Sequence, residues 1–160
     1  FRLGYQGLGE ILCFFAYGPL ALSAVYYSQT SHWSIANLCT SVFLGISTSV
    51  ILYCSHFHQV EDDRAAGKRS PIVRLGTQRG AALLPWFCGC AYGSVLVSIA
   101  LGLMPLEALL VFGSLPFAIK LCLYVREHHN HPSKVSSSKF IAVAMHFWSG
   151  LLLGLGFLLA

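Results

Sequence analysis

The chain has 160 residues, of which 56% are hydrophobic and 10% are charged, and its formal net charge is +4. Soluble domains carry about 25% charged residues, so this composition excludes an ordinary soluble domain and indicates an integral membrane protein. The positive charge is the sum of a few loop residues rather than a basic face, which argues against a nucleic-acid partner.

Five apolar blocks follow one another along the chain, and each is long enough for the roughly 20 residues of one helical membrane crossing. They cover residues 8–27, 34–56, 81–103, 106–125 and 140–160. Gly18 and Pro19 interrupt the first block, so we expect a kink there that neighbouring helices can tolerate. The sequence therefore predicts an all-α, integral membrane bundle of five transmembrane helices.

The connections between the blocks differ in charge. Residues 57–80 and 126–139 contain eight Lys and Arg residues between them, whereas residues 28–33 and 104–105 contain none. Because short basic loops stay on the cytoplasmic side of a membrane, we expect both basic loops to face the cytoplasm or, in a plastid, the stroma.

Charged residues are concentrated in the first basic loop. His56–Thr77 contains three of the six acidic residues and four of the ten basic ones. At helical spacing, Gln59 and Asp63 share a face, so the end of the second block is expected to direct several oxygen ligands into one pocket. Mg²⁺ is usually held by one or two carboxylates together with substrate phosphates, and this loop offers both carboxylates and cations.

The cations of this loop have two possible roles. Arg can bind phosphate oxygens through two parallel hydrogen bonds and Lys binds them as a point charge, while Gly67 permits a tight turn among them. Alternatively, the loop is a solvated segment whose charges only set membrane orientation. The acidic triplet favours the first interpretation, since orientation requires only Lys and Arg.

The run Glu61–Lys68, followed by Arg74–Gly76, resembles the second aspartate-rich motif of the UbiA superfamily of intramembrane prenyltransferases. Within it the chain is most similar to the MenA branch, especially the cyanobacterial and plastid dihydroxynaphthoate phytyltransferases. The similarity extends over residues 3–10 and 138–150 and covers essentially the whole chain. It implies a fold of nine transmembrane helices, of which the five blocks here correspond to helices five to nine.

The resemblance implies that an amino-terminal half, with a first aspartate-rich motif, precedes this chain, and that the chain alone is inactive. The implied reaction is the Mg²⁺-dependent transfer of a prenyl or phytyl group from its diphosphate to 1,4-dihydroxy-2-naphthoate, in phylloquinone or menaquinone biosynthesis. The implied setting is a plastid or cyanobacterial (thylakoid or inner) membrane.

The resemblance also implies residue roles. The catalytic candidates are Asp63, Asp62 and Glu61. The metal candidates are the same three carboxylates and Gln59, which stands where the family has a second aspartate. The diphosphate candidates are Lys68, Arg69, Arg74 and Arg64. The weaker substrate candidates are His56, Tyr5 and Glu10.

Two other function classes compete with this hypothesis. The chain could act on another aromatic acceptor of the same superfamily. It could also be a non-enzymatic transporter or assembly subunit, in which the acidic triplet is an ion relay or a docking site.

Two histidine positions lie outside the motif. We expect His146, within the last block, to find a local hydrogen-bond partner, because buried polar groups usually pair. We expect His128, His129 and His131 to lie in a solvated loop rather than at a metal, since adjacent histidines are poorly spaced for one tetrahedral site.

Overall fold

The structure is a computed structural model that describes residues 2–160, and within this range every regular element is helical. The elements are η1 (Leu3–Gln6), α1 (Gly9–Phe15), η2 (Ala16–Leu20), α2 (Ala21–Thr30), α3 (Ile35–Ser55), α4 (Val60–Ala65), α5 (Pro71–Leu75), α6 (Thr77–Ala100), η3 (Leu106–Ser114), α7 (Leu115–His128), α8 (Pro132–Val135) and α9 (Ser138–Leu159). The all-α fold class is confirmed.

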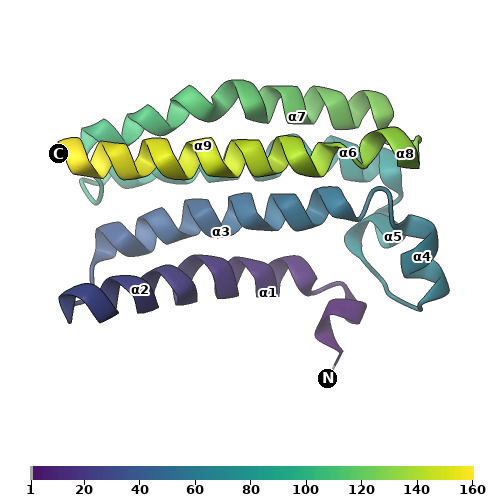
Figure 1. Cartoon of the computed structure of the whole chain (residues 1–160), viewed down its shortest axis with the longest axis horizontal. Helices are drawn as coiled ribbons and strands as arrows, with labels where there is room; N and C mark the ends of the chain where they lie inside the picture. The colour runs from purple at the N-terminus through teal and green to yellow at the C-terminus, as the bar shows by residue number, and fades with distance from the viewer. Residues whose placement is uncertain (1) are drawn as a thin grey trace.

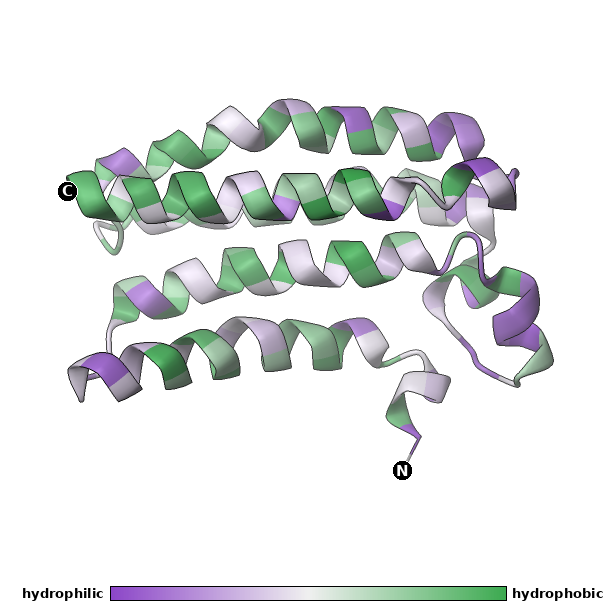
Figure 2. Ribbon diagram, viewed as in Figure 1, coloured by the Kyte–Doolittle hydropathy of each residue, from purple (hydrophilic) through white to green (hydrophobic). Residues whose placement is uncertain are grey.

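Five helical segments are long and apolar enough to cross a membrane, as predicted. They lie side by side, with the α1–α2 rod against α3 and the other three spans beyond α3 (Figure 1). Hydrophobic residues cover the rods, and hydrophilic residues gather around α4 and where α7 meets α8 (Figure 2). The chain is an integral membrane protein.

The helices end a few residues away from several predicted block boundaries, including those next to the two basic loops. The third span begins at Thr77 rather than at residue 81, because the polar residues before the apolar block continue the helix. Much of the predicted loop 126–139 is also helical, since α7 extends to His128 and α9 begins at Ser138. Hydropathy predicts which part of a helix lies within the lipid, but it does not predict where the helix ends outside the lipid.

The first span contains the irregular turn that Gly18 and Pro19 predict. Residues Ala16–Leu20 form one π-helical turn, which widens the helix around a proline that has no N–H to donate. Gly18 is buried there, and a Cβ on it would clash with the carbonyl oxygen of Ser41. The absence of a side chain at this turn lets the first span lie directly against α3.

His146 is half-buried and has a hydrogen-bond partner, but the partner lies on another helix and is not local in the sequence. Its Nδ1 lies 2.8 Å from the hydroxyl oxygen of Ser47 on α3. This hydrogen bond links α3 to α9 within the spanning region.

Replacing Ser47 with alanine is expected to destabilise the bundle by about 1–3 kcal/mol, because His146 is left without a partner. Thr48→Ala is the matched control, since the hydroxyls of Ser47 and Thr48 both donate to the Leu44 carbonyl and Thr48 has no contact with His146. Thermal unfolding in detergent should show a lower midpoint for Ser47→Ala than for Thr48→Ala. Equal midpoints would mean that the bond to His146 contributes nothing.

Candidate functional site

The polar stretch between α3 and α6 is a compact cap at one end of the bundle (Figure 1). A turn follows α3, and Gln59 then caps the start of α4, which is a separate short helix. The four-residue spacing is nevertheless kept, because the Asp63 N–H donates to the Gln59 carbonyl over 2.7 Å. The chain then turns back, and the Lys68 N–H donates to the Asp63 carbonyl over 2.7 Å.

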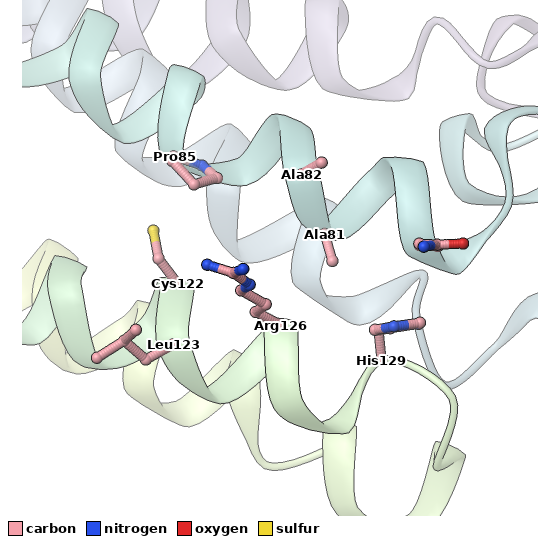
Figure 3. Close-up of a pocket in the computed structure, with 8 residues that line it drawn as sticks. Ala81, Ala82, Pro85, Cys122, Leu123, Arg126 and His129 are labelled. Atoms are coloured by element: carbon pink, nitrogen blue, oxygen red, sulfur yellow. The ribbon is translucent and has the colours of Figure 1, made fainter.

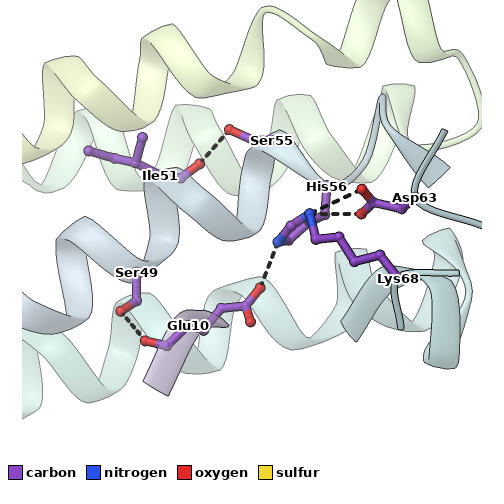
Figure 4. Close-up of polar contacts among 7 residues, drawn as sticks. All are labelled: Glu10, Ser49, Ile51, Ser55, His56, Asp63 and Lys68. Carbon is purple, nitrogen blue, oxygen red and sulfur yellow. Dashed lines mark hydrogen bonds and ion pairs between the residues drawn. The ribbon is translucent and has the colours of Figure 1, made fainter. Parts of the chain in front are cut away.

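Asp63 belongs to a chain of polar side chains in contact with one another (Figure 4). Its Oδ1 lies 3.0 Å from Lys68 Nζ, and its Oδ2 lies 3.1 Å from His56 Nδ1. The other ring nitrogen, His56 Nε2, lies 3.2 Å from Glu10 Oε1. Three separate segments of the chain, α1, the end of α3 and the cap, therefore meet at one polar cluster.

The environment of Asp63 favours its charged form. Burial alone raises the pKa of this carboxyl, but the nearby Ser70 hydroxyl, the Lys68 ammonium and His56 outweigh burial and hold the pKa below its ordinary value. Asp63 is therefore a carboxylate at neutral pH. With two lone pairs on each oxygen, it can accept further contacts beside those from Lys68 and His56.

The two neighbouring carboxylates have a different environment. Glu61 and Asp62 are exposed on α4, whereas Asp63 is buried. Because successive residues of a helix are rotated by about 100°, three consecutive side chains cannot all face one point. The expected convergence of the whole acidic triplet is therefore not observed, and only Asp63 is fixed in position.

A basic cavity of about 630 Å³ lies next to this cluster. Its lining consists of Arg2, Tyr5, Gln6, Leu8, Gly67, Arg69 and Arg74. Three guanidinium groups around one cavity form a strong site for phosphate oxygens.

The segment η1 closes this cavity through main-chain contacts. The Arg69 N–H donates to the Tyr5 carbonyl over 2.8 Å, and the Arg74 guanidinium donates to the Gln6 carbonyl. Gly7 has a φ of +78°, and a Cβ on it would clash with the Arg69 carbonyl oxygen. A glycine at this position is therefore required for η1 to reach the cap.

The structure brings most of the predicted site residues to two places. His56, Glu10, Asp63 and Lys68 form the polar cluster, whereas Tyr5, Arg69 and Arg74 line the basic cavity. Arg64 lies exposed on α4 and lines neither, and Lys68 is paired with Asp63 instead of facing the cavity.

Three contributors to the site were missed or undervalued in the sequence. Arg2, Gln6 and Gly7 were not among the site candidates taken from the sequence. Their role depends on η1 folding back over residues 67–74, which are more than 60 positions away. A short polar segment carries no periodic signal for such a contact.

A bound cation is consistent with part of this cluster. Both carboxylate oxygens of Glu10 are buried and have no hydrogen-bond partner, although Oε1 is close to His56, and Asp63 offers free lone pairs. Hard oxygen donors of this kind suit Mg²⁺. Within residues 2–160, however, no three His, Cys, Asp or Glu side chains converge on one point.

The sequence profile of the UbiA prenyltransferase family matches residues 1–159. The chain belongs to this family. It is 50% identical over 157 residues to a 2-carboxy-1,4-naphthoquinone phytyltransferase of Synechocystis sp., a match that covers 98% of this chain and 51% of the relative. It is 42% identical over 168 residues to the chloroplastic protein of the same name in Arabidopsis thaliana, covering 100% of this chain and 44% of the relative.

A more distant UbiA-family relative is the 1,4-dihydroxy-2-naphthoate octaprenyltransferase of Haemophilus influenzae, with 30% identity over 97 residues, 61% of this chain and 29% of the relative. No solved structure matches the chain. The chain spans about half the length of the two phytyltransferases that it matches most fully. The polar cluster and the basic cavity are therefore features of one part of a family fold.

Proposed function

We propose that the complete protein carrying this chain transfers a phytyl or similar prenyl group from its diphosphate to 1,4-dihydroxy-2-naphthoate. The observation that carries the proposal is the buried, ionised Asp63 next to a cavity with three arginines, at the water-facing end of a membrane bundle. The printed names of the relatives, 2-carboxy-1,4-naphthoquinone phytyltransferase and 1,4-dihydroxy-2-naphthoate octaprenyltransferase, support a carboxylated naphthalene-ring acceptor, and the cyanobacterial and plant names favour phytyl as the donor group. The segments that those relatives have beyond the match, with a first aspartate-rich motif, would complete the site.

The basic cavity is the proposed diphosphate site. The Arg74 guanidinium is already oriented because it donates to the Gln6 carbonyl, and the main chain of Arg69 is held by its contact with the Tyr5 carbonyl. Arg2 supplies a third cation. Arg64 lies outside the cavity and contributes only to the positive electrostatic potential around it. A prenyl chain attached to a diphosphate bound here can extend from the polar cap into the lipid-facing spans.

Asp63 is the proposed fixed ligand of Mg²⁺, with Glu10 as a nearby donor. Glu61, Asp62 and Gln59 lie within four residues of Asp63 and would be outer donors, since Mg²⁺ keeps several waters. The cation would neutralise the charge that develops on the departing diphosphate. In its absence, Lys68 and His56 hold the Asp63 carboxylate in position.

The reaction is balanced without a protein base. The bond from the first prenyl carbon to the diphosphate oxygen breaks, and a bond from that carbon to the naphthoate ring forms. The ring carbon loses its carboxylate as CO₂. The electrons of that broken C–C bond return to the ring and restore its aromaticity, so no proton has to be removed from this carbon. The residues therefore need to bind, orient and neutralise charge, and the arginines and Asp63 are suited to that task.

The proposed orientation follows from the two basic loops. With residues 57–80 and 126–139 on the cytoplasmic or stromal side, the cap faces the compartment from which charged substrates arrive. The similarity to cyanobacterial and chloroplastic relatives favours a thylakoid or related membrane. Both the acceptor and the diphosphate head could then enter from water while the prenyl tail stays in lipid.

The test uses membranes that contain the complete gene product, labelled phytyl diphosphate, dihydroxynaphthoate and Mg²⁺. Formation of a prenylated naphthoquinol, which oxygen of the air oxidises to the naphthoquinone that mass spectrometry identifies, is expected. 4-Hydroxybenzoate in place of the naphthoate tests the acceptor class. No product with either acceptor would contradict the proposal, and product with the benzoate alone would make the acceptor wrong.

The role proposed for His56 predicts different effects of two substitutions. His56→Asn keeps a nitrogen near the Nδ1 position and so keeps a donor toward Asp63, whereas His56→Gln places its amide nearer Nε2 and toward Glu10. If His56 acts by positioning Asp63, His56→Asn should retain several-fold more turnover than His56→Gln at saturating Mg²⁺. The opposite order would show that the contact with Glu10 matters more.

A further inference from the structure

A cleft separates α6 from α7 on a part of the bundle that the transferase proposal does not use. It consists of two adjoining cavities of about 520 Å³ and 310 Å³, which share Pro85, Cys122 and Leu123 in their linings. Side chains from both helices surround the space, with Cys122, Arg126 and His129 directed from the α7 side toward α6 (Figure 3). The cleft therefore extends from the water-facing end of the bundle into the spanning region.

The deeper part of the cleft is apolar. Gly89, Tyr92, Ala118 and Ile119 line it, together with the shared residues. Gly89 is exposed, and a Cβ built on it meets no other atom within 4 Å, so the space beside it is open. An apolar, open slot between two membrane-spanning helices suits a hydrocarbon chain.

The mouth of the cleft is basic and held in place. His129 Nδ1 lies 3.1 Å from the hydroxyl oxygen of Thr77, and that hydroxyl donates to the side-chain oxygen of Asn130 over 2.9 Å. These bonds tie the end of α7 to the start of α6. Next to them, Arg126 lines the cleft, and no hydrogen bond or ion pair involves its guanidinium within the part of the chain that the structure describes.

We propose that this cleft binds an anionic phospholipid, with its headgroup at Arg126 and one acyl chain along the apolar slot. The two parts of such a lipid match the two parts of the cleft. The unpaired guanidinium at the membrane boundary suits the anionic headgroup, and the apolar slot directly below it suits the acyl chain. A protein helix, which is about 10 Å wide, is a less suitable occupant of the cleft. It would leave Arg126 buried without a partner unless it carried a carboxylate near the guanidinium. The proposal does not depend on the transferase activity.

The test measures phosphatidylglycerol and phosphatidylcholine bound to the complete gene product in detergent, by native mass spectrometry. Arg126→Gln is expected to lower the preference for phosphatidylglycerol about fivefold, the effect of removing one basic residue near a lipid headgroup. Lys134→Gln, an exposed basic residue on the same side but outside the cleft, should change the preference less than twofold. Equal effects of the two variants would overturn the proposal.

A second variant fills the apolar slot without removing charge. Gly89→Leu has room for its side chain and favours the helix, so the protein should fold, and binding of both lipids should fall. Millimolar inorganic phosphate should leave phosphatidylglycerol bound. Lipid binding that is unchanged in Gly89→Leu, or displacement by inorganic phosphate alone, would contradict an acyl chain in this cleft.

Discussion

Replacing Asp63 with asparagine is expected to lower turnover about 100- to 1,000-fold, the range found when one preorganised electrostatic contact is lost from an active site. Asparagine has almost the same shape, but it removes the charge that balances Lys68 and that a metal ion requires. The loss should appear mainly in kcat, because the prenyl diphosphate would still find the arginines. The measurement is the rate of prenylated product at saturating donor and acceptor.

The control for Asp63→Asn is Glu127→Gln, which makes the same change of charge at an exposed position of α7, away from the polar cluster. It should leave turnover within about twofold of the unmodified protein, in the ordinary range of surface substitutions. Yield and thermal midpoint in detergent separate a catalytic loss from a folding loss. Asp63→Asn turnover within threefold of the unmodified protein would mean that this carboxylate is not a metal ligand of the reaction.

Replacing Arg74 with glutamine is expected to raise the KM for the prenyl diphosphate about 10- to 100-fold. A hydrogen bond to a charged group contributes about 1.5–3 kcal/mol, and Arg74 also donates to the Gln6 carbonyl that closes the cavity. Arg74→Lys should give an intermediate value, because lysine keeps the charge but lacks the planar, two-pronged geometry. The KM for the naphthoate acceptor should change much less.

Arg79→Gln is the matched control for Arg74→Gln. Arg79 is an exposed arginine near the start of α6, on the same side of the membrane, and it does not line the basic cavity. An equal rise in donor KM for both variants would show that the general positive charge of the loop attracts the diphosphate. A donor KM unchanged in Arg74→Gln would remove the cavity from the proposed site.

The helical architecture was predictable from the sequence because lipid imposes a simple requirement on it. A spanning segment must be long, apolar and helical, and each of the five blocks meets that requirement. Even the irregular turn at Pro19 follows from a residue that cannot donate its backbone N–H. Helix ends in water follow from local caps and turns, so the early start of α6 and the late end of α7 were not predictable.

The candidate site was predictable only in part. Asp63 and the cations after it stand out as charges in an apolar chain, and their spacing places them on one short segment. The contact of His56 with Glu10 joins residues 46 positions apart, and the contact of Arg69 with Tyr5 joins residues 64 positions apart. Contacts of that kind depend on how the first span packs against α3, which local sequence does not encode.

The central claim is that this polar cap belongs to a site where a prenyl diphosphate is cleaved as its chain is transferred to an aromatic ring. The most direct measurement is the release of inorganic diphosphate by the complete gene product, followed together with the prenylated naphthoquinone. We predict one diphosphate released per product formed, only when both phytyl diphosphate and dihydroxynaphthoate are present, and almost none with Asp63→Asn. Diphosphate release that does not require the acceptor, or that persists in Asp63→Asn, would contradict the account.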